Sequence, residues 1–226
     1  MSLLDNFDCI TLDWPPKAPE WYKQVPGQYA TVAEPDRPLV ALIKPNIEHG
    51  PWIAGGAALS WYTGNAVQDR DIDVWFRDQE QLNKVRSQLI EAKAALIFQS
   101  DNAETYQIYA YMGDGNTTMF KVQLITREFF DNASEIVDLF DISVCQMVTD
   151  GTVTVVGEHT VEDVASKKLR LLKERPDMLK RIVKYMAYGY SFPPEKLLEY
   201  VETQFDFDTN LGEYDVLFLK GDSNGV

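Results

Sequence analysis

The segment that most constrains the fold lies between residues 51 and 76, where an apolar run, two glycines and two aspartates follow one another. It reads PWIAGGAALSWYTG and then, after six residues, DIDVWF. The first run predicts a short strand that ends at Gly55 and Gly56, followed by a short helix that stops at residues 63–65. The β-branched and aromatic residues of DIDVWF predict a second strand. We therefore expect strand, turn, helix and strand in this order.

Asp71 and Asp73 are two residues apart in the second strand, so their side chains share one face, while Ile72 and Val74 face the core. Two carboxylates this close repel each other unless a cation lies between them, and Mg²⁺ or Mn²⁺ takes such oxygen ligands. The glycines begin a helix, whose N–H groups favour anions, and they let a phosphate approach closely. A metal-bound triphosphate fits both features. Taken singly, each feature also fits an ordinary turn or a solvated strand face.

The rest of the chain predicts a mixed or antiparallel α/β (α+β) sheet and then helices, rather than a doubly wound parallel sheet. Two strand-like runs, TYQIYAYM and TTMFKVQLIT, flank residues 113–116 (GDGN), which are typical of a hairpin turn. A second hairpin is expected over 141–157, turning at residues 150–151, and residues 37–44 fit a helix or a strand. Helices are expected at 78–96, 133–140, 160–173, 177–188 and 193–203, the third with Thr160 as N-cap.

These patterns divide the chain near residue 158. Residues 1–158 are expected to form an α/β core with a proline-rich N-terminal segment, and residues 159–226 a helical lobe with an acidic tail. No run approaches the roughly 18 to 20 apolar residues of a membrane span. The N-terminus lacks the basic start of a secretory signal, and the two distant cysteines fit reduced thiols, so a cytoplasmic location is expected.

The charge balance limits the classes of partner. The formal net charge is −14, from 21 basic and 35 acidic residues, which argues against a protein that coats duplex DNA or binds it sequence-specifically. Contacts with RNA, nucleotide or phosphate are therefore expected in the one basic segment, unless its charges are only the solvated face of a helix. The segment contains Lys167, Lys168, Arg170, Lys173, Arg175, Lys180, Arg181 and Lys184.

Two further cations are candidates for the site. Arg70 stands next to the acid pair and could neutralise a triphosphate, or it could form a surface salt bridge with Asp69 or Asp78. Lys121, in the predicted strand KVQLI, is open to the same two interpretations.

The order WIAGGAALSWYTG followed by DIDVWF resembles the DNA polymerase beta-like nucleotidyltransferase superfamily, whose signature is a hydrophobic strand, Gly-Gly or Gly-Ser, a short helix and an hDhDh strand. The later runs FKVQLI, LFDISVCQM and LKRIVKYMAYGY resemble small nucleotidyltransferase-like proteins of phages and large DNA viruses. The resemblance covers about residues 50–190. It implies that Asp71 and Asp73 bind Mg²⁺ or Mn²⁺ and that Gly55 and Gly56 hold a nucleoside triphosphate.

The resemblance also implies a reaction and further contacts. The chain would move a nucleoside monophosphate from the triphosphate to an acceptor, which could be RNA, protein or a small molecule, with two metal ions at the site. The helical lobe would border the cleft, and Lys180, Arg181 and Lys184, which fall within about one helical turn, would contact the nucleotide or the acceptor.

Two positions depart from the family pattern. Gln123 stands where the third carboxylate is usual, and Ala57 where a serine often holds phosphate, so backbone amides would have to suffice. Asp141 could supply the missing carboxylate as a catalytic residue if it opens a strand, or it could be a structural turn residue. The alternatives to an active enzyme are a catalytically weak nucleotide-binding or regulatory protein, and a toxin that modifies host tRNA or protein.

Overall fold

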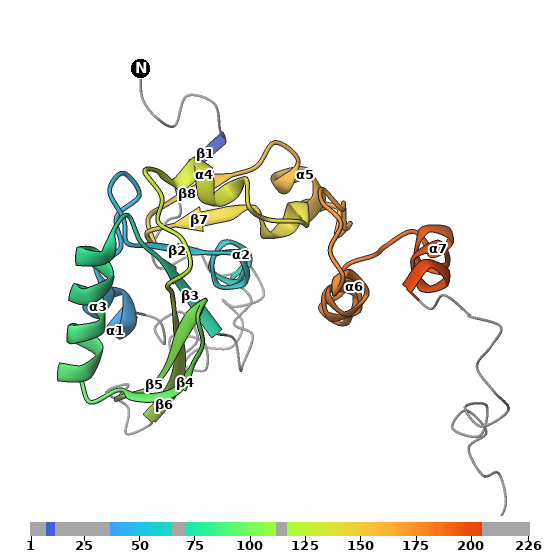
Figure 1. Cartoon of the computed structure of the whole chain (residues 1–226). Helices are drawn as coiled ribbons and strands as arrows, with labels where there is room; N and C mark the ends of the chain where they lie inside the picture. The colour runs from blue at the N-terminus through green and yellow to red at the C-terminus, as the bar shows by residue number, and fades with distance from the viewer. Residues whose placement is uncertain (1–7, 12–36, 65–70, 112–116, 205–226) are drawn as a thin grey trace, which may run out of the picture. The chain divides into compact units, whose positions relative to one another are not determined.

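A computed structural model describes residues 8–11, 37–64, 71–111 and 117–204 of the chain (Figure 1). The chain divides into two compact units, Met1–Lys173 and Glu174–Val226, and the division expected near residue 158 stays a prediction. Residues 166–173 stay with the first unit because Leu171 forms a β-bridge with Ile142, and the N–H of Leu172 donates to the carbonyl of Asp141 at 2.8 Å. Within the described residues, no helix has the length and apolar character needed to cross a membrane.

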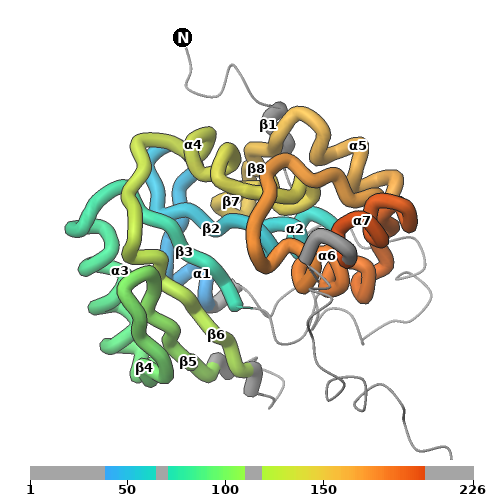
Figure 2. Tube along the Cα trace, turned by 45° about the vertical axis from the view of Figure 1, so that its right-hand side comes forward, coloured from blue at the N-terminus to red at the C-terminus, as the bar shows by residue number. Residues whose placement is uncertain are grey.

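The first unit is built on a sheet in which the described strands have the order β1-β8-β7-β2-β3-β6-β5-β4. Strands β3 and β6 pair in parallel, and the other neighbours pair antiparallel, which confirms the expected mixed sheet. Figure 2 shows β3, β6, β5 and β4 following one another across the sheet. The strands are β1 (Asp8–Thr11), β2 (Trp52–Ala54), β3 (Asp71–Trp75), β4 (Ala95–Gln99), β5 (Ala103–Tyr111), β6 (Thr117–Ile125), β7 (Met147–Thr149) and β8 (Val153–Val156).

The described part of the first unit also contains several helices. They are α1 (Arg37–Ile43), α2 (Gly56–Thr63), α3 (Gln79–Glu91), α4 (Ala133–Val137), the 3-10 helix η2 (Ser143–Cys145) and α5 (Thr160–Ala165). Helix α3 begins where the Asp78 side chain accepts a hydrogen bond from the N–H of Gln81, and α2 ends at Gly64 in the left-handed region. The second unit contains α6 (Met178–Ala187) and α7 (Pro194–Gln204).

Alternation along the strands gives the sheet two different faces. Ile72 and Val74 of β3 and Val122 of β6 are buried in a core that α1 and α3 cover, and Figure 1 shows these helices on the same side of the sheet. On the opposite face, Trp52 and Trp75 are buried in a second core to which α4 contributes. This second core covers β2, β7 and the end of β3, and it leaves the start of β3 with polar side chains.

Three predicted helices are shorter in the structure, and the one expected over 133–140 ends at Val137. The helix expected over 78–96 ends at Glu91, because Lys93 takes a positive φ of 61° and the chain reverses into β4, which pairs with β5. The helix expected over 160–173 ends at Ala165, and its N-cap is His159. Thr160 instead is fully buried, and its hydroxyl donates to the carbonyl of Ser143 at 2.9 Å.

The second hairpin is also shorter than predicted. Residues 143–145 form η2 instead of a strand, and only β7 and β8 pair across the turn at Gly151, whose φ is 89°. Residues 37–44, which fitted either element, include α1. The tip of the first predicted hairpin, residues 113–116, lies outside the described residues, while its strands β5 and β6 pair along their length.

Candidate functional site

The turn between β2 and α2 places two glycines beside an aspartate. Ala54, the last residue of β2, is the register partner of Asp73 in β3, and Gly55 follows directly. Gly55 has φ 67° and ψ −129°, and its N–H donates to the carbonyl of Met147 at 2.9 Å. A Cβ added at Gly55 would lie 2.9 Å from Cε1 of Phe140. Both the backbone conformation and the available space therefore require glycine here.

The second glycine has different surroundings. A Cβ added at Gly56 would meet no heavy atom within 4 Å, so the backbone at this position borders open space. The methyl group of Ala57 is buried in the core that α1 and α3 cover, so only its backbone could contact a ligand. Gly56 begins α2, where the N–H groups of the first turn and the helix dipole favour an anion. We call residues 55–57 the glycine turn.

Asp71 and Asp73 project from the same face of β3, on the side opposite to Ile72. Asp71 is exposed and Asp73 is half-buried. In the parallel pairing with β6, Lys121 is the register partner of Asp71, and Gln123 is the register partner of Asp73. The open face of the sheet thus presents two acids, one cation and one amide on adjacent strands.

Gln123 therefore lies next to Asp73, at the position that the family resemblance assigns to a third carboxylate. Its Nε2 donates to the Oγ1 atom of Thr105 in β5 at 3.3 Å, and Thr105 is its register partner. Asp73, Gln123 and Thr105 consequently form one row across three strands. Within this row, the amide oxygen of Gln123 is the possible metal ligand next to the acid pair.

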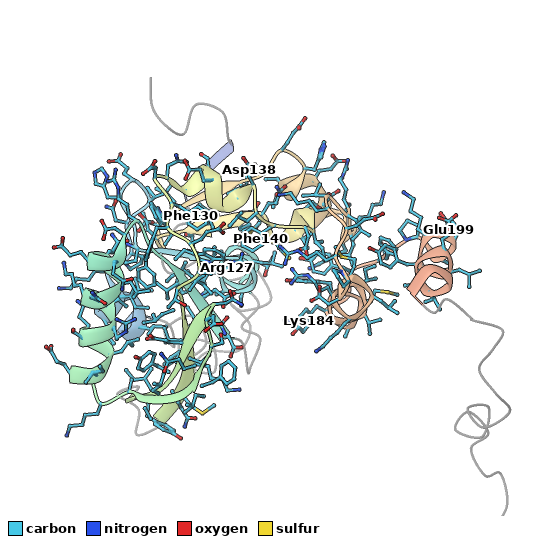
Figure 3. All side chains as sticks on the ribbon, in the orientation of Figure 1. Arg127, Phe130, Asp138, Phe140, Lys184 and Glu199 are labelled. Carbon is cyan, nitrogen blue, oxygen red and sulfur yellow. The ribbon has the colours of Figure 1, made fainter. Side chains whose placement is uncertain are left out.

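An aromatic group borders the acid pair on the side of α4. Trp75, two residues after Asp73 and on the same face, contacts the rings of Phe130 and Phe140 edge-on, with centroid distances of 5.5 Å and 6.4 Å. The guanidinium of Arg127 lies 5.5 Å from the Trp75 ring centroid, and Figure 3 labels Arg127, Phe130 and Phe140 in this part of the unit. Since Phe140 also limits the space at Gly55, these rings set the position of the glycine turn relative to β3.

Asp141 follows Phe140 in the chain. Its side chain is fully buried, and it precedes a single bridge residue and η2 instead of opening a strand. Among the residues that the structure describes, no group of three or more His, Cys, Asp or Glu side chains could hold a metal ion together. Asp141 therefore forms no such group with Asp71 and Asp73, and the catalytic role of Asp141 stays a prediction.

The other predicted nucleotide contacts fall into two groups. Arg70 lies outside the described residues. Lys180, Arg181 and Lys184 lie on α6 in the second unit, where the two lysines are exposed and Arg181 is half-buried. Figure 3 labels Lys184 on this helix. Tyr185, also on α6, is buried.

Two ion pairs escaped prediction because no local pattern marks them: one joins residues 18 positions apart, and the other joins residues 7 positions apart. Arg86 of α3 donates to Glu104 of β5 at 2.8 Å, and this hydrogen bond holds the pKa of Glu104 below its ordinary value, although burial opposes the shift. Arg170, a member of the basic segment, pairs with Asp163. Burial raises the pKa of Asp163, but hydrogen bonds from Arg170 and Ser143 outweigh it and lower the pKa. Both pairs support the fold.

The fold and the site together define a protein with the polymerase beta-like nucleotidyltransferase fold. The structure is similar to a CCA-adding enzyme of Thermotoga maritima complexed with tRNA, with 15% identity and a TM-score of 0.50 over 75% of this chain and 43% of that chain. It is also similar to a CCA-adding enzyme complexed with CTP, with 14% identity and a TM-score of 0.53 over 77% of this chain and 44% of the other. The chain thus matches less than half the length of these enzymes.

The sequence comparison identifies the family. The model of the Gabija anti-defense 2 (Gad2) family matches residues 34–167, which is more than half of the chain, and the chain belongs to this phage-related family. A search of curated proteins found no match.

Proposed function

We propose that the protein is a metal-dependent nucleotidyltransferase that moves a nucleoside monophosphate from a nucleoside triphosphate to an acceptor. The observation that carries the proposal is the register of β2, β3 and β6. It places the glycine turn directly after the residue paired with Asp73, and Asp73 beside Gln123. A site for phosphate and a site for its counter-cation therefore adjoin each other.

The donor set fits a magnesium or manganese nucleotide. Magnesium in such sites is usually held by one or two carboxylates and by phosphate oxygens of the substrate. Asp71 and Asp73 supply the carboxylates, and the Gln123 amide oxygen is a neutral neighbour. When bound, the metal would neutralise charge on the phosphates.

The residues of the chain would act mainly by positioning and charge compensation. The backbone of the glycine turn would hold the phosphates at the start of α2. Arg70 and the α6 cations Lys180, Arg181 and Lys184 are proposed as further nucleotide contacts. The acceptor oxygen would bond to the α-phosphorus, the bond to the bridging oxygen would break, pyrophosphate would leave, and the acceptor proton would pass to solvent.

RNA is the first acceptor to test, and protein the second. The structural neighbours are described with tRNA and with CTP, which makes RNA and a nucleoside triphosphate reasonable partners for this chain. Membership of a phage-related family would place the activity in the cytoplasm of an infected host, directed at the host or its defence.

Label transfer tests the proposal. The protein is incubated with each α-labelled nucleoside triphosphate, Mg²⁺ or Mn²⁺, and total cellular RNA and protein. We expect label in one acceptor class, lost in Asp73→Asn and kept in Asp101→Asn, which changes an exposed acid of the first unit away from the site. Equal transfer by wild type and Asp73→Asn, with both proteins folded, would remove the assignment.

Gln123 favours a second candidate, a nucleotide-binding or regulatory protein with weak catalysis. An amide cannot accept the proton of the acceptor as a carboxylate can, and it binds metal more weakly. Triphosphate binding that depends on Asp73, without label transfer to any acceptor, would select this candidate. Growth arrest on expression, relieved by Asp71→Ala, would instead indicate a toxin that modifies host tRNA or protein.

A further inference from the structure

We propose that the acceptor is the unpaired end of a single-stranded nucleic acid, and that its bases stack on Phe98 and Tyr109 on the open face of β4, β5 and β6. This inference rests on the proposed function, because it identifies the acceptor from the direction in which the acceptor must approach the acid pair.

The register defines one row of residues across five adjacent strands. Ala54, Asp73, Gln123, Thr105 and Phe98 are successive partners on β2, β3, β6, β5 and β4. Neighbouring strands are about 4.8 Å apart, so Phe98 lies about 14 Å from Asp73. The glycine turn is at one end of this row and Phe98 at the other.

The geometry of phosphoryl transfer gives the row a direction. The attacking and leaving oxygens lie roughly in line on opposite sides of the phosphorus. With the phosphates at the glycine turn beside β2, pyrophosphate leaves toward β2. In this arrangement the acceptor hydroxyl approaches from the side of β6, β5 and β4.

Thr105 in this row is buried, whereas Phe98 at the end of the row and Tyr109, four residues along β5 from Thr105, are exposed and suit bases. Phe98 is 59% exposed and Tyr109 is 63% exposed, while Met119, the register partner of Tyr109, is 38% exposed. Two-residue alternation places Tyr109 on the same face as Thr105, and Met119 on the same face as Gln123. The amide of Gln107 donates to the Tyr109 hydroxyl, which helps to hold that ring in position.

These side chains favour a nucleic acid over a protein acceptor. Exposed aromatic rings on an open sheet face stack unpaired bases with little regard to sequence, since every base has a π-face. Lys121 lies between Asp71 and Gln107 in the adjoining row, and it could contact one phosphate of the nucleic-acid backbone. With a chain charge of −14, stacking rather than general attraction would supply much of the affinity.

Binding is tested first without catalysis, using a fluorescein-labelled 12-nucleotide single-stranded RNA and fluorescence anisotropy. We expect the double variant Phe98→Ala/Tyr109→Leu to weaken binding about tenfold or more, the scale of one stacked base. Tyr109→Phe, which keeps the ring, should bind within about twofold of wild type. Leu96→Ala should also bind the RNA within about twofold of wild type. Leu96 is 49% exposed, but it is the register partner of Tyr106 and therefore lies on the other face of β4.

Turnover with the same RNA separates this proposal from the proposed function. We expect the double variant to raise KM for the RNA and to leave KM for the triphosphate unchanged, with an unaltered melting temperature. RNA binding that the double variant weakens, without any label transfer, would contradict the proposed function and support the stacking surface. Unchanged RNA affinity in the double variant, or transfer of label to protein alone, would overturn the inference.

Discussion

The two faces of the β3–β6–β5 part of the sheet use the same strands for different purposes. On the covered face, an acid is satisfied within the fold: Glu104 accepts hydrogen bonds from Arg86 and from the hydroxyl of Tyr106. On the open face, Asp71 is exposed and Asp73 is half-buried, where a ligand can reach them. The difference teaches that the exposure of a carboxylate, and not its presence in a strand, separates the structural role of Glu104 from the binding role that we propose for Asp71 and Asp73.

The largest expected effect is a difference in the free energy of unfolding between variants of two adjacent residues of β6, Leu124 and Gln123. Leu124 is fully buried on the covered face, so Leu124→Ala should lower the free energy of unfolding by about 2–5 kcal/mol. Gln123→Ala, one residue away on the open face, should cost less than about 1 kcal/mol. Urea unfolding of both variants measures this, and equal losses would break the distinction between the faces.

A second pair of variants separates a structural glycine from a proposed binding glycine within the glycine turn. Gly55→Ala should cost about 1–3 kcal/mol, because it places a side chain at a positive φ and against Phe140. Gly56→Ala should change stability little, since its Cβ has space, yet weaken triphosphate binding by crowding the phosphates. Thermal unfolding and triphosphate titration report the two effects, and a Gly56→Ala protein with full affinity would count against phosphate at this turn.

The ion pair on the covered face predicts a dependence on pH. The Arg86 hydrogen bond lowers the pKa of Glu104, so its stabilisation is present above the ordinary value of 4.5 and is lost as pH falls through the lowered value. Glu104→Gln should cost about 1–2 kcal/mol at neutral pH and less in acid. Asp163 titrates in the same direction, so the informative quantity is the difference between wild type and variant, which should shrink below the ordinary pKa.

The smallest predicted effect concerns the metal. Gln123→Asp places a third carboxylate beside Asp73, and we expect Mn²⁺ affinity to rise about tenfold, a change near 1.4 kcal/mol. Gln107→Asp adds the same charge one row away and should change the affinity less. Mn²⁺ titration followed by electron paramagnetic resonance compares them, and equal gains would mean that only net charge matters.

Local patterns predicted the part of the fold that contains the site. The glycines, the two-residue spacing of the aspartates and the apolar neighbours of each are contiguous, so β2, α2 and β3 follow from residues 51–76. Register was not predictable, because the pairing of Asp73 with Gln123 joins strands that are fifty residues apart. The end of α3 was missed because the reversal at Lys93 has no glycine to mark it, and η2 because an apolar run fits a strand equally well.

The central claim is that the acid pair and the glycine turn together hold one metal-bound triphosphate. Calorimetric titration of the protein with a non-hydrolysable triphosphate analogue tests it most directly, with Mg²⁺ and with EDTA, for wild type and Asp73→Asn. The account predicts binding by wild type that requires Mg²⁺ and falls at least about a hundredfold in Asp73→Asn, with an unchanged melting temperature. Equal binding by both proteins, or binding that ignores the metal, would contradict it.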